Sequence, residues 1–450
     1  DILNEEPLLY SADAEFIRIK TLYRIGTKDS VTQARTKLAT SRKIYPLDER
    51  FPRIFFMFES LFMNASEKYG QQYELPPDVL KIAMDYIVKF PDYKTKDIEM
   101  ELFASMLISG ETQKRLLQAI GEKNNFHPLY AYVALKAGVI SQEKAFNLFF
   151  DSSDNFYPLY LIESFAPLIT DEQLKVNLIK HINSFSGTLA VDEDLDLRKE
   201  LIIKYERGRP QYISYDENTD GVLEVYAACD FGVPLSVSFV SNKIDLFYDL
   251  YPAVQRVSMN GKNGVFYFLG DDYSYTPFEM TVHPPFESLG VDFYVPYIKK
   301  DLEVPDYDLL FSKAARFDVN TYERNASYVR YTFLDGKPRM AYFYEGKKFF
   351  AYGDVSKGFP FVRYVDYDGD EIYETTEYFD IDTEDVYATE EDKKIIKTIL
   401  GDIPFAQNIY LKKVEVDRDS DTLIEFKEEY LPNGGKIISW DNDDNGIWDS

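Results

Sequence analysis

The spacing of apolar residues changes near Tyr205, and this change constrains the fold more than any other feature of the chain. Before it, apolar residues recur three and four positions apart, as in "AEFIRIKTLYRIG" (14–26). That period places apolar side chains on one face of an α-helix. After it, stretches such as "GVFYFLG" (264–270) are rich in aromatic and β-branched residues, which is typical of strands. The sequence therefore predicts an α+β multidomain protein, with helices first and antiparallel sheet second.

Residues 1–205 form the predicted helical domain. Amphipathic segments of about 10–16 residues follow one another with short connectors, a pattern typical of an α-solenoid. The residues between about 30 and 46 resemble the second helix of a tetratricopeptide repeat. Small or apolar residues stand where two such helices pack closely, and a proline stands where the helix ends. The matching residues are Ala34, Leu38, Ser41 and Pro46.

The rest of the helical region fits that repeat loosely. Arg18 stands where the repeat has an aromatic residue, and Leu22 stands where it has a small one. The next comparable helix ending, at Pro91, comes 45 residues after Pro46, whereas the repeat length is 34. An irregular helical domain therefore remains the alternative to a tetratricopeptide-like solenoid.

Residues 206–300 and 301–450 form two predicted β units. Gly- and Asp-containing turns separate strand-like stretches, which is typical of a hairpin meander. Of the 36 tyrosines, 25 lie beyond residue 200. Two helical inserts are expected, at 306–317 and 389–400, and the proline-containing segment 283–297 reads as a linker.

Charge is distributed unevenly between the two regions. Residues 1–200 carry 30 acidic and 24 basic residues, whereas residues 201–450 carry 47 and 26. The total net charge of -27 argues against nucleic acids and anionic membranes as partners. Cations are the expected partners of the second region.

The chain has a single cysteine, Cys229, which excludes an intramolecular disulfide and cysteine-based zinc sites. Its three histidines are far apart in sequence. No apolar run is long enough to span a membrane. The chain begins "DILNEEPLLY", without an initiator methionine, so we expect either that a leader has been removed or that the sequence is a fragment. We expect an extracytoplasmic protein, in the periplasm or at the cell surface, from the resemblance to exported proteins given below.

Four nine-residue segments of the second region align without gaps. We call them the first, second, third and fourth acidic loops (216–224, 366–374, 417–425 and 441–449). Each has oxygen-bearing side chains at positions 1, 3, 5 and 9 and an aliphatic residue at position 7. The candidate metal ligands are Asp216, Asn218, Asp220 and Glu224; Asp366, Asp368, Asp370 and Glu374; Asp417, Asp419, Asp421 and Glu425; and Asp441, Asp443, Asn445 and Asp449.

This pattern predicts calcium binding. Ca²⁺ prefers six to eight oxygen ligands from a flexible loop, whereas Mg²⁺ is less suited to an all-protein cage of oxygens. An EF-hand would place its last carboxylate at position 12. The loops are similar instead to the calcium-binding hairpin loops of integrin alpha-chain propellers, with the motif D-x-D-x-D-G-x-x-D. Glu371 and Thr422 replace the position-6 glycine, which predicts weaker sites in the second and third loops.

Acidic turns that serve only solubility are the alternative reading, and four gapless matches in one region weigh against it. The loop starts are 150, 51 and 24 residues apart, which favours a meander over a regular propeller.

No common catalytic motif appears, so we expect a non-enzymatic protein. Helical repeats followed by such loops resemble exported bacterial scaffold proteins, including periplasmic tetratricopeptide proteins of spirochaetes. The resemblance implies a protein-protein interaction scaffold of the cell envelope, with an accessory role in an assembly such as the flagellar motor, and a protein partner on the helical surface. A surface adhesin or glycan-binding protein that uses exposed tyrosines is the main alternative, and a carbohydrate-active enzyme is a third. The sequence predicts no oligomeric state.

Overall fold

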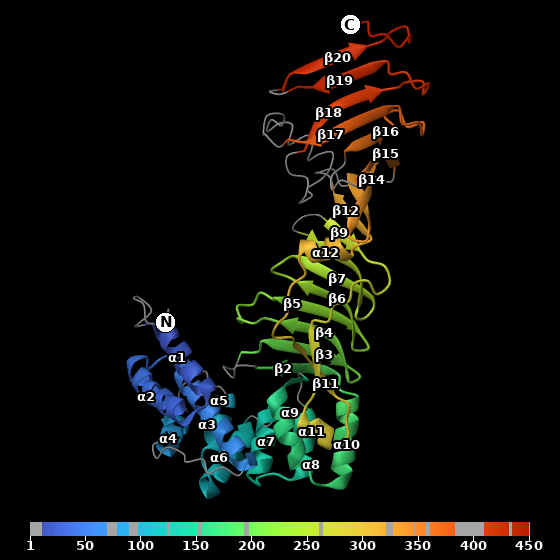
Figure 1. The fold of residues 1–450 in the computed structure, drawn as a ribbon. Helices are drawn as coiled ribbons and strands as arrows, with labels where there is room; N and C mark the ends of the chain where they lie inside the picture. Colours follow the sequence, from blue (N-terminus) through green and yellow to red (C-terminus); the bar gives the residue numbers. More distant parts are fainter. Residues whose placement is uncertain are drawn as a thin grey trace. The chain divides into compact units, whose positions relative to one another are not determined.

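The chain folds into two compact units in the computed structural model (Figure 1). The first unit comprises Asp1–Leu223 with Met280–Tyr297, and the second comprises Glu224–Glu279 with Ile298–Ser450. The structure describes residues 11–69, 79–89, 98–123, 127–151, 155–192, 198–260, 264–320, 327–345, 348–355, 361–382, 409–431 and 434–449.

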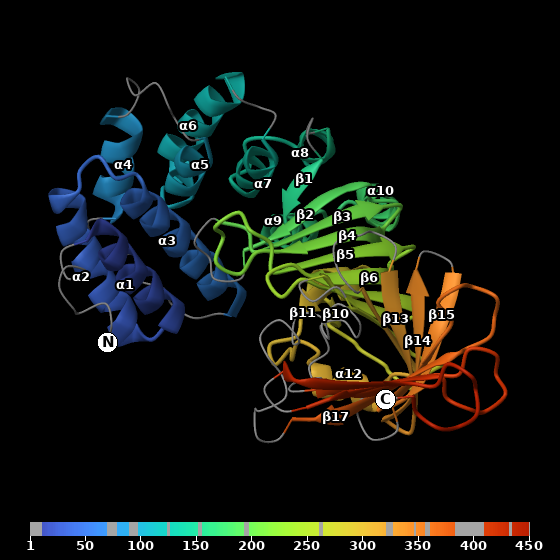
Figure 2. The same cartoon turned by 90° about the horizontal axis from the view of Figure 1, so that it is seen from above.

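Helices dominate the first unit. They are α1 (Ala12–Ile25), α2 (Lys28–Ile44), α3 (Arg50–Tyr69), α4 (Val79–Lys89), α5 (Ile98–Met106), α6 (Gly110–Lys123), α7 (Pro128–Lys136), α8 (Gln142–Phe150), α9 (Leu159–Phe165), α10 (Glu172–Asn183) and the short α11 (Pro284–Ser288). Helices α1, α2 and α3 lie side by side (Figure 1, Figure 2).

Capping side chains fix where the first helices begin. The Ser11 and Thr27 hydroxyls accept hydrogen bonds from Ala14 and Ser30, which satisfies backbone donors that a helix start leaves free. Ala34, Leu38 and Ser41 are almost completely buried, as expected where α2 packs closely on its neighbours.

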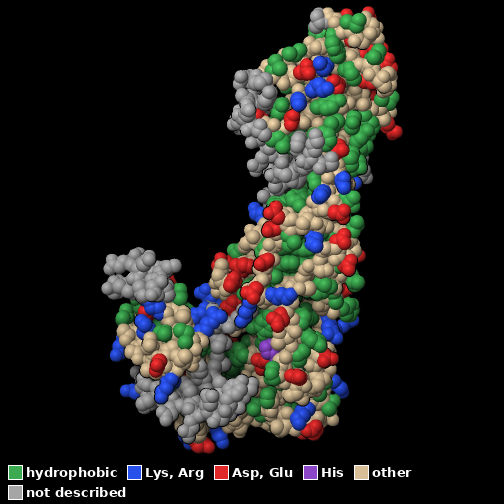
Figure 3. All heavy atoms as spheres, in the orientation of Figure 1, with side chains coloured by type: hydrophobic (Ala, Val, Ile, Leu, Met, Phe, Trp, Pro, Cys, Tyr) green, Lys and Arg blue, Asp and Glu red, His purple; other side chains and the backbone are tan. Residues whose placement is uncertain are grey.

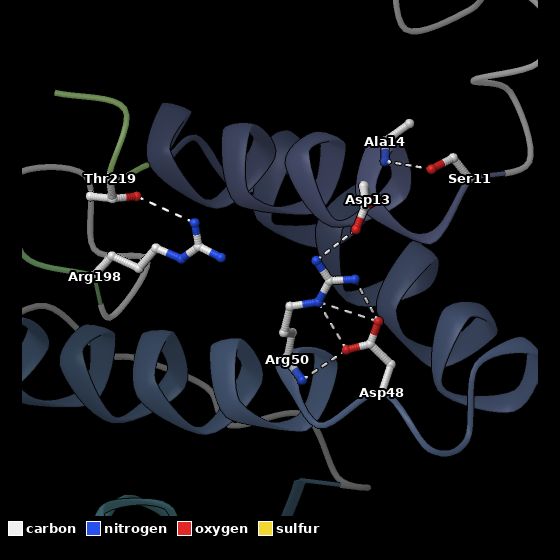
Figure 4. A network of polar contacts seen from close by, with 7 residues as sticks. All are labelled: Ser11, Asp13, Ala14, Asp48, Arg50, Arg198 and Thr219. Atoms are coloured by element: carbon white, nitrogen blue, oxygen red, sulfur yellow. Dashed lines mark hydrogen bonds and ion pairs between the residues drawn. The ribbon is translucent and has the colours of Figure 1, made fainter. Parts of the chain in front are cut away.

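A charged cluster joins the starts of α1 and α3. The Arg50 guanidinium lies 2.7 Å from a carboxylate oxygen of Asp13 in α1 and 2.7 Å from one of Asp48 (Figure 4). The hydrogen bond from Arg50 outweighs burial and lowers the pKa of Asp48 below its ordinary value. The same guanidinium lies over the ring of Phe16 in α1. The cluster therefore fixes the relative placement of α1 and α3.

Four strands complete the first unit. Strands β1 (Phe156–Pro158) and β2 (Gly187–Val191) are parallel, whereas β2, β3 (Leu201–Glu206) and β4 (Arg209–Tyr215) pair antiparallel in that order. The prediction of helix up to residue 205 was therefore wrong at its end. Strand β3 alternates buried and exposed residues, and two β-branched residues lie at its centre, so the period-2 pattern prevails over a helical one.

Met280–Tyr297, which we call the strap, belongs to the first unit although residues of the second unit precede and follow it. It was expected to be a linker, but it contains α11 and most of β11 (Tyr294–Ile298), which pairs with β10 (Phe278–Val282). Phe293 stacks on Tyr205, and the Tyr205 hydroxyl donates to the Tyr294 carbonyl at 2.8 Å. Phe286 is completely buried. Aromatic packing therefore holds the strap in place.

The second unit is one continuous antiparallel sheet. Its strands are β5 (Val225–Asp230), β6 (Val233–Phe239), β7 (Ile244–Leu250), β8 (Ala253–Met259), β9 (Gly264–Tyr267), β12 (Arg316–Asn320), β13 (Ser327–Leu334), β14 (Lys337–Glu345), β15 (Lys348–Asp354), β16 (Val362–Val365), β17 (Thr375–Ile381), β18 (Ile409–Val416), β19 (Phe426–Tyr430) and β20 (Lys436–Trp440). Each pairs with the next strand in this order. Helix α12 (Tyr307–Lys313) precedes β12.

Buried and exposed residues alternate along the strands of this meander, and the alternation weakens toward the last strands. Strands β5, β7 and β17 bury every second residue along much of their length. In contrast, β19 and β20 bury none, and Ile437, Ile438 and Trp440 of β20 are 39–48% exposed. Apolar burial thus contributes little to the end of the sheet.

The coarse prediction of an α+β protein, with helices followed by antiparallel sheet, is confirmed. The tetratricopeptide-like solenoid stays a prediction, because many of the helices are short. The helical insert predicted at 389–400 lies outside the described residues. In the parts of the chain that the structure covers, no helix combines the length and the apolar character needed to span a membrane.

Candidate metal-binding loops

Three of the four acidic loops lie along one long edge of the sheet in the second unit, the edge that is formed by the ends of the strands. The second loop joins β16 to β17, the third joins β18 to β19, and the fourth follows β20. Because successive hairpins alternate between the two edges of a meander, these loops emerge on the same side (Figure 1). Neighbouring strands are about 4.8 Å apart, so loops two strands apart are spaced by roughly 10 Å. Figure 3 shows acidic side chains along this edge.

Main-chain hydrogen bonds connect these loops in series. The N–H of Asp417, the first residue of the third loop, donates to the carbonyl of Glu374, the last residue of the second loop, at 2.8 Å. The N–H of Asp441 donates in the same way to the carbonyl of Glu425, at 2.9 Å. The first residue of the third loop and that of the fourth loop are therefore each hydrogen-bonded to the last residue of the loop before it.

All four loops share one internal hydrogen-bond pattern. The carboxylate at position 1 accepts the N–H of position 6, and the side-chain oxygen at position 5 accepts the N–H of position 7. In the second, third and fourth loops, the carboxylate at position 9 also accepts the N–H of position 2. These bonds curl each loop around its own side chains, so the alignment found in the sequence corresponds to a common conformation.

Positions 4 and 6 have positive φ in every loop, whether or not glycine is present. At position 6, φ is 90° for Gly221 and 77° for Gly446, and it is 73° for Glu371 and 82° for Thr422. The side-chain hydrogen bonds therefore impose this conformation even on residues that adopt it rarely. Weaker metal binding by the second and third loops stays a prediction. Its reason is backbone strain at Glu371 and Thr422, because the backbone shape itself is the same in all four loops.

Carboxylate oxygens converge in three of the loops. Within each set below, the oxygens lie within 4.8 Å of one another: Asp366, Asp368 and Glu374; Asp417, Asp419 and Glu425; Asp441, Asp443 and Asp449. A further set, Asp419, Asp421 and Asp444, joins the third loop to the fourth. In the described part of the chain, the carboxylates of the first loop do not form such a set, although the sequence made this loop a leading candidate.

The electrostatics of these carboxylates differ. Burial raises the pKa of Asp441, but the N–H groups of Gly446 and Asn445 lower it more, so it lies below its ordinary value. The pKa of Asp444 is raised, first by burial and then by the charges of Asp421 and Asp419. One Asp444 oxygen is buried without a hydrogen-bond partner. Negative charge is therefore least compensated between the third and fourth loops.

Such sites suit a hard divalent cation. Carboxylate, amide and carbonyl oxygens are the ligands that Ca²⁺ and Mg²⁺ prefer, and a nine-residue loop can supply several of them. The structure thus shows several acidic clusters that could hold a metal ion.

Among the described residues, the cysteine and the three histidines belong to no cluster of metal-ligand type. Cys229 is buried in β5, and burial raises the pKa of its thiol to about 12. His127 caps α7, His181 stacks on Phe150, and His283 lies 2.6 Å from Glu163. Each histidine therefore has a separate structural role.

Two residues near the loops escaped the sequence analysis. Asp444 was overlooked because it stands at position 4, which was not counted as a ligand. Lys348 was overlooked because it lies 18 residues before the second loop in sequence, although strand pairing brings it close. Only the register of β15 with β16 could have revealed it.

No protein-family model matches this chain, and no curated protein matches it.

Proposed function

We propose that the protein is a non-enzymatic, extracytoplasmic interaction scaffold whose β region is stabilised by calcium. The helical unit binds a protein partner, as an accessory component of a cell-envelope assembly such as a flagellar motor. The sheet holds the chain in an extended array of hairpins.

The observation that carries this proposal is the repetition of one loop conformation on consecutive hairpins. Three loops gather carboxylates, and two of them, the third and the fourth, adjoin the strands that bury no residue. A bound divalent cation would neutralise each cluster and hold the hairpin ends together. Because the cation binds the folded loop and not the unfolded chain, it raises the free energy of unfolding.

Calcium fits better than magnesium for a physical reason. Mg²⁺ requires near-ideal octahedral geometry and releases its water ligands reluctantly, whereas Ca²⁺ accepts irregular coordination by six to eight oxygens. An extracytoplasmic location would supply calcium at the concentrations that modest sites need.

Thermal unfolding of the full chain tests the calcium claim. EDTA should lower the midpoint, Ca²⁺ should restore it, and Mg²⁺ should have little effect. Calcium at 100 times the Kd contributes about 2.7 kcal/mol per site. Asp417→Asn combined with Asp441→Asn should reduce the calcium response, whereas Asp271→Asn, outside the loops, should not. A midpoint that is the same in EDTA and in Ca²⁺ would remove calcium from the proposal.

Exposed apolar side chains support a protein partner for the helical unit. Ile17 and Ile25 of α1 and Ile44 of α2 are 46–61% exposed, and Leu47 is 83% exposed. Exposed apolar residues mark a contact surface only where they form one contiguous patch, and these four residues are the positions at which we test for one. Affinity capture with the full chain should recover a specific protein, and Ile17→Ser with Ile44→Ser should reduce its recovery while Val176→Ser on α10 should not. Equal recovery by both would argue against this surface.

The alternative, glycan binding, rests on two rows of half-exposed aromatic residues across β13–β16. One row consists of Tyr328, Tyr344 and Phe349, and the other of Tyr342, Tyr352 and Tyr364. Within each row, successive residues are direct partners on neighbouring strands. The Tyr328 and Tyr344 rings stack at 4.6 Å and 6°, so each covers one face of the other. Sugar stacking needs free ring faces, and this stacking leaves the pair one face on each ring. A glycan array distinguishes the two functions, because specific hits lost in Tyr364→Ala would favour the alternative.

A further inference from the structure

Two buried tyrosine hydroxyls of the second unit lack a partner from the protein. Tyr248 in β7 is 7% exposed, and Tyr273 is 4% exposed. Among the residues that the structure describes, neither hydroxyl has a hydrogen-bond partner. A buried hydroxyl without a hydrogen bond costs free energy, and native proteins rarely leave one in that state. The two hydroxyls therefore indicate a ligand that the described chain itself does not supply.

Strand pairing places the two tyrosines on one face of the sheet. Tyr248 is the direct partner of Val254 in β8. On the other side of β8, the N–H of Val254 donates to the carbonyl of Tyr273 at 2.8 Å, next to the bridge between Ala253 and Ser274. Direct partners on neighbouring strands project from the same face, so Tyr248, Val254 and Tyr273 form one row. Because a valine side chain is much shorter than a tyrosine, Val254 does not separate the two hydroxyls.

Two more tyrosines surround this pair. The Tyr251 ring lies 5.1 Å from the Tyr248 ring, and the Tyr275 ring lies 6.3 Å from the Tyr273 ring. The Tyr275 hydroxyl already donates to the Glu303 carbonyl at 2.7 Å. Burial raises the pKa of Tyr248 above its ordinary value, and the other three tyrosines of this cluster raise it further. Four phenol groups are thus gathered in one buried place.

The chemistry of this place favours a neutral ligand. Burial also raises the pKa of Tyr273, and the charge of Asp306 adds to that effect. Both hydroxyls therefore stay protonated at neutral pH, and each can donate one hydrogen bond and accept others. The charge of Asp306 opposes an anion. A cation would need carboxylate oxygens, and the Asp306 carboxylate already accepts the N–H of Leu309 as the cap of α12, at 2.8 Å.

We propose that Tyr248 and Tyr273 hold one buried water molecule between their hydroxyls. A buried water typically makes about three hydrogen bonds to polar groups that would otherwise be unpaired, and two such groups are present here. The segment after β9 pairs with β8 through an isolated bridge at Ser274. The water adds a second connection, from that segment across β8 to β7.

Removal of single hydroxyls tests this inference by the sign of the effect. Tyr248→Phe and Tyr273→Phe should each lower the thermal midpoint of the full chain by roughly 2–4 °C, because each loses a hydrogen bond to the water. The double variant should lose less than the sum of the two losses, since both hydroxyls act on the same water. Tyr364→Phe removes the hydroxyl of a tyrosine that is 36% exposed, and this matched control should leave the midpoint unchanged.

The opposite sign would refute the inference. If each hydroxyl is unpaired, phenylalanine removes its cost and raises the midpoint. Additive losses would refute a shared water. A crystal structure of the full chain, at a resolution that shows ordered water, gives a test that does not depend on the folding of any variant. One water oxygen should lie about 2.7–2.8 Å from both hydroxyls. Electron density without a water there, or with both hydroxyls bonded to protein groups, would overturn the proposal.

Discussion

Replacing Arg363 should strongly destabilise the second unit. Arg363 in β16 lies directly opposite Glu377 in β17, and the two residues are only 4% and 5% exposed. The Arg363 Nε donates to Glu377 at 2.7 Å. Arg363→Met keeps the length of the side chain but leaves the Glu377 carboxylate buried without its cationic partner. Breaking a buried pair in this way typically costs about 3–5 kcal/mol.

Neighbouring groups set the expected value within that range. The Tyr367 hydroxyl also donates to Glu377, at 3.1 Å, and it compensates the carboxylate in part. Arg363 lies over the Phe343 ring at 4.9 Å, and this cation–π contact adds a smaller loss of about 0.5–1 kcal/mol. We therefore expect a decrease in the free energy of unfolding near the lower end, about 3 kcal/mol.

Urea unfolding followed by tryptophan fluorescence measures this loss. Both tryptophans of the chain, Trp440 and Trp448, lie in the second unit, so the signal reports on it. Lys412→Met removes an exposed pair with Asp380 and should cost less than about 1 kcal/mol. Arg363→Met with Glu377→Leu should recover most of the stability, because neither charge is then buried alone. A loss below about 1 kcal/mol for Arg363→Met would show that Glu377 is adequately solvated or paired without it.

Two further predictions concern single groups of the second unit. Asp444→Asn should raise the thermal midpoint in EDTA: a carboxyl whose pKa is raised in the folded state costs stability when it is ionised, and this cost is lost as pH falls through its folded pKa. The stabilisation should therefore be present at pH 7 and shrink toward acidic pH, and a variant that melts lower than the native chain at pH 7 would contradict it. Cys229, with a pKa of about 12, should resist alkylation at pH 8 in the folded protein and react after unfolding in urea, as mass spectrometry can show; rapid labelling of the folded chain would contradict its burial.

The sequence predicted the local features of the site well, because they depend on neighbouring residues. Alternating Asp and Asn side chains bond to backbone N–H groups a few positions away, so the conformation of the second loop follows from nine residues. The same reasoning holds for the N-terminal caps of α1 and α2.

Features that depend on distant pairing were not predictable in this way. Lys348 reaches the second loop only through the register of β15 with β16, and Asp444 meets Asp421 only because two hairpins are adjacent. The strand at Leu201–Glu206 was missed because its apolar residues fit both periods over so short a length.

The strap also affects the order in which the protein can complete its folding. Phe286 and Phe293 belong to the aromatic core of the first unit, yet they follow residues 224–279 of the second unit in the chain. During translation, five strands of the second unit are therefore synthesised before the first unit can be completed. A chaperone or translocation factor that holds the growing polypeptide would meet an incomplete helical unit until Tyr297 has emerged.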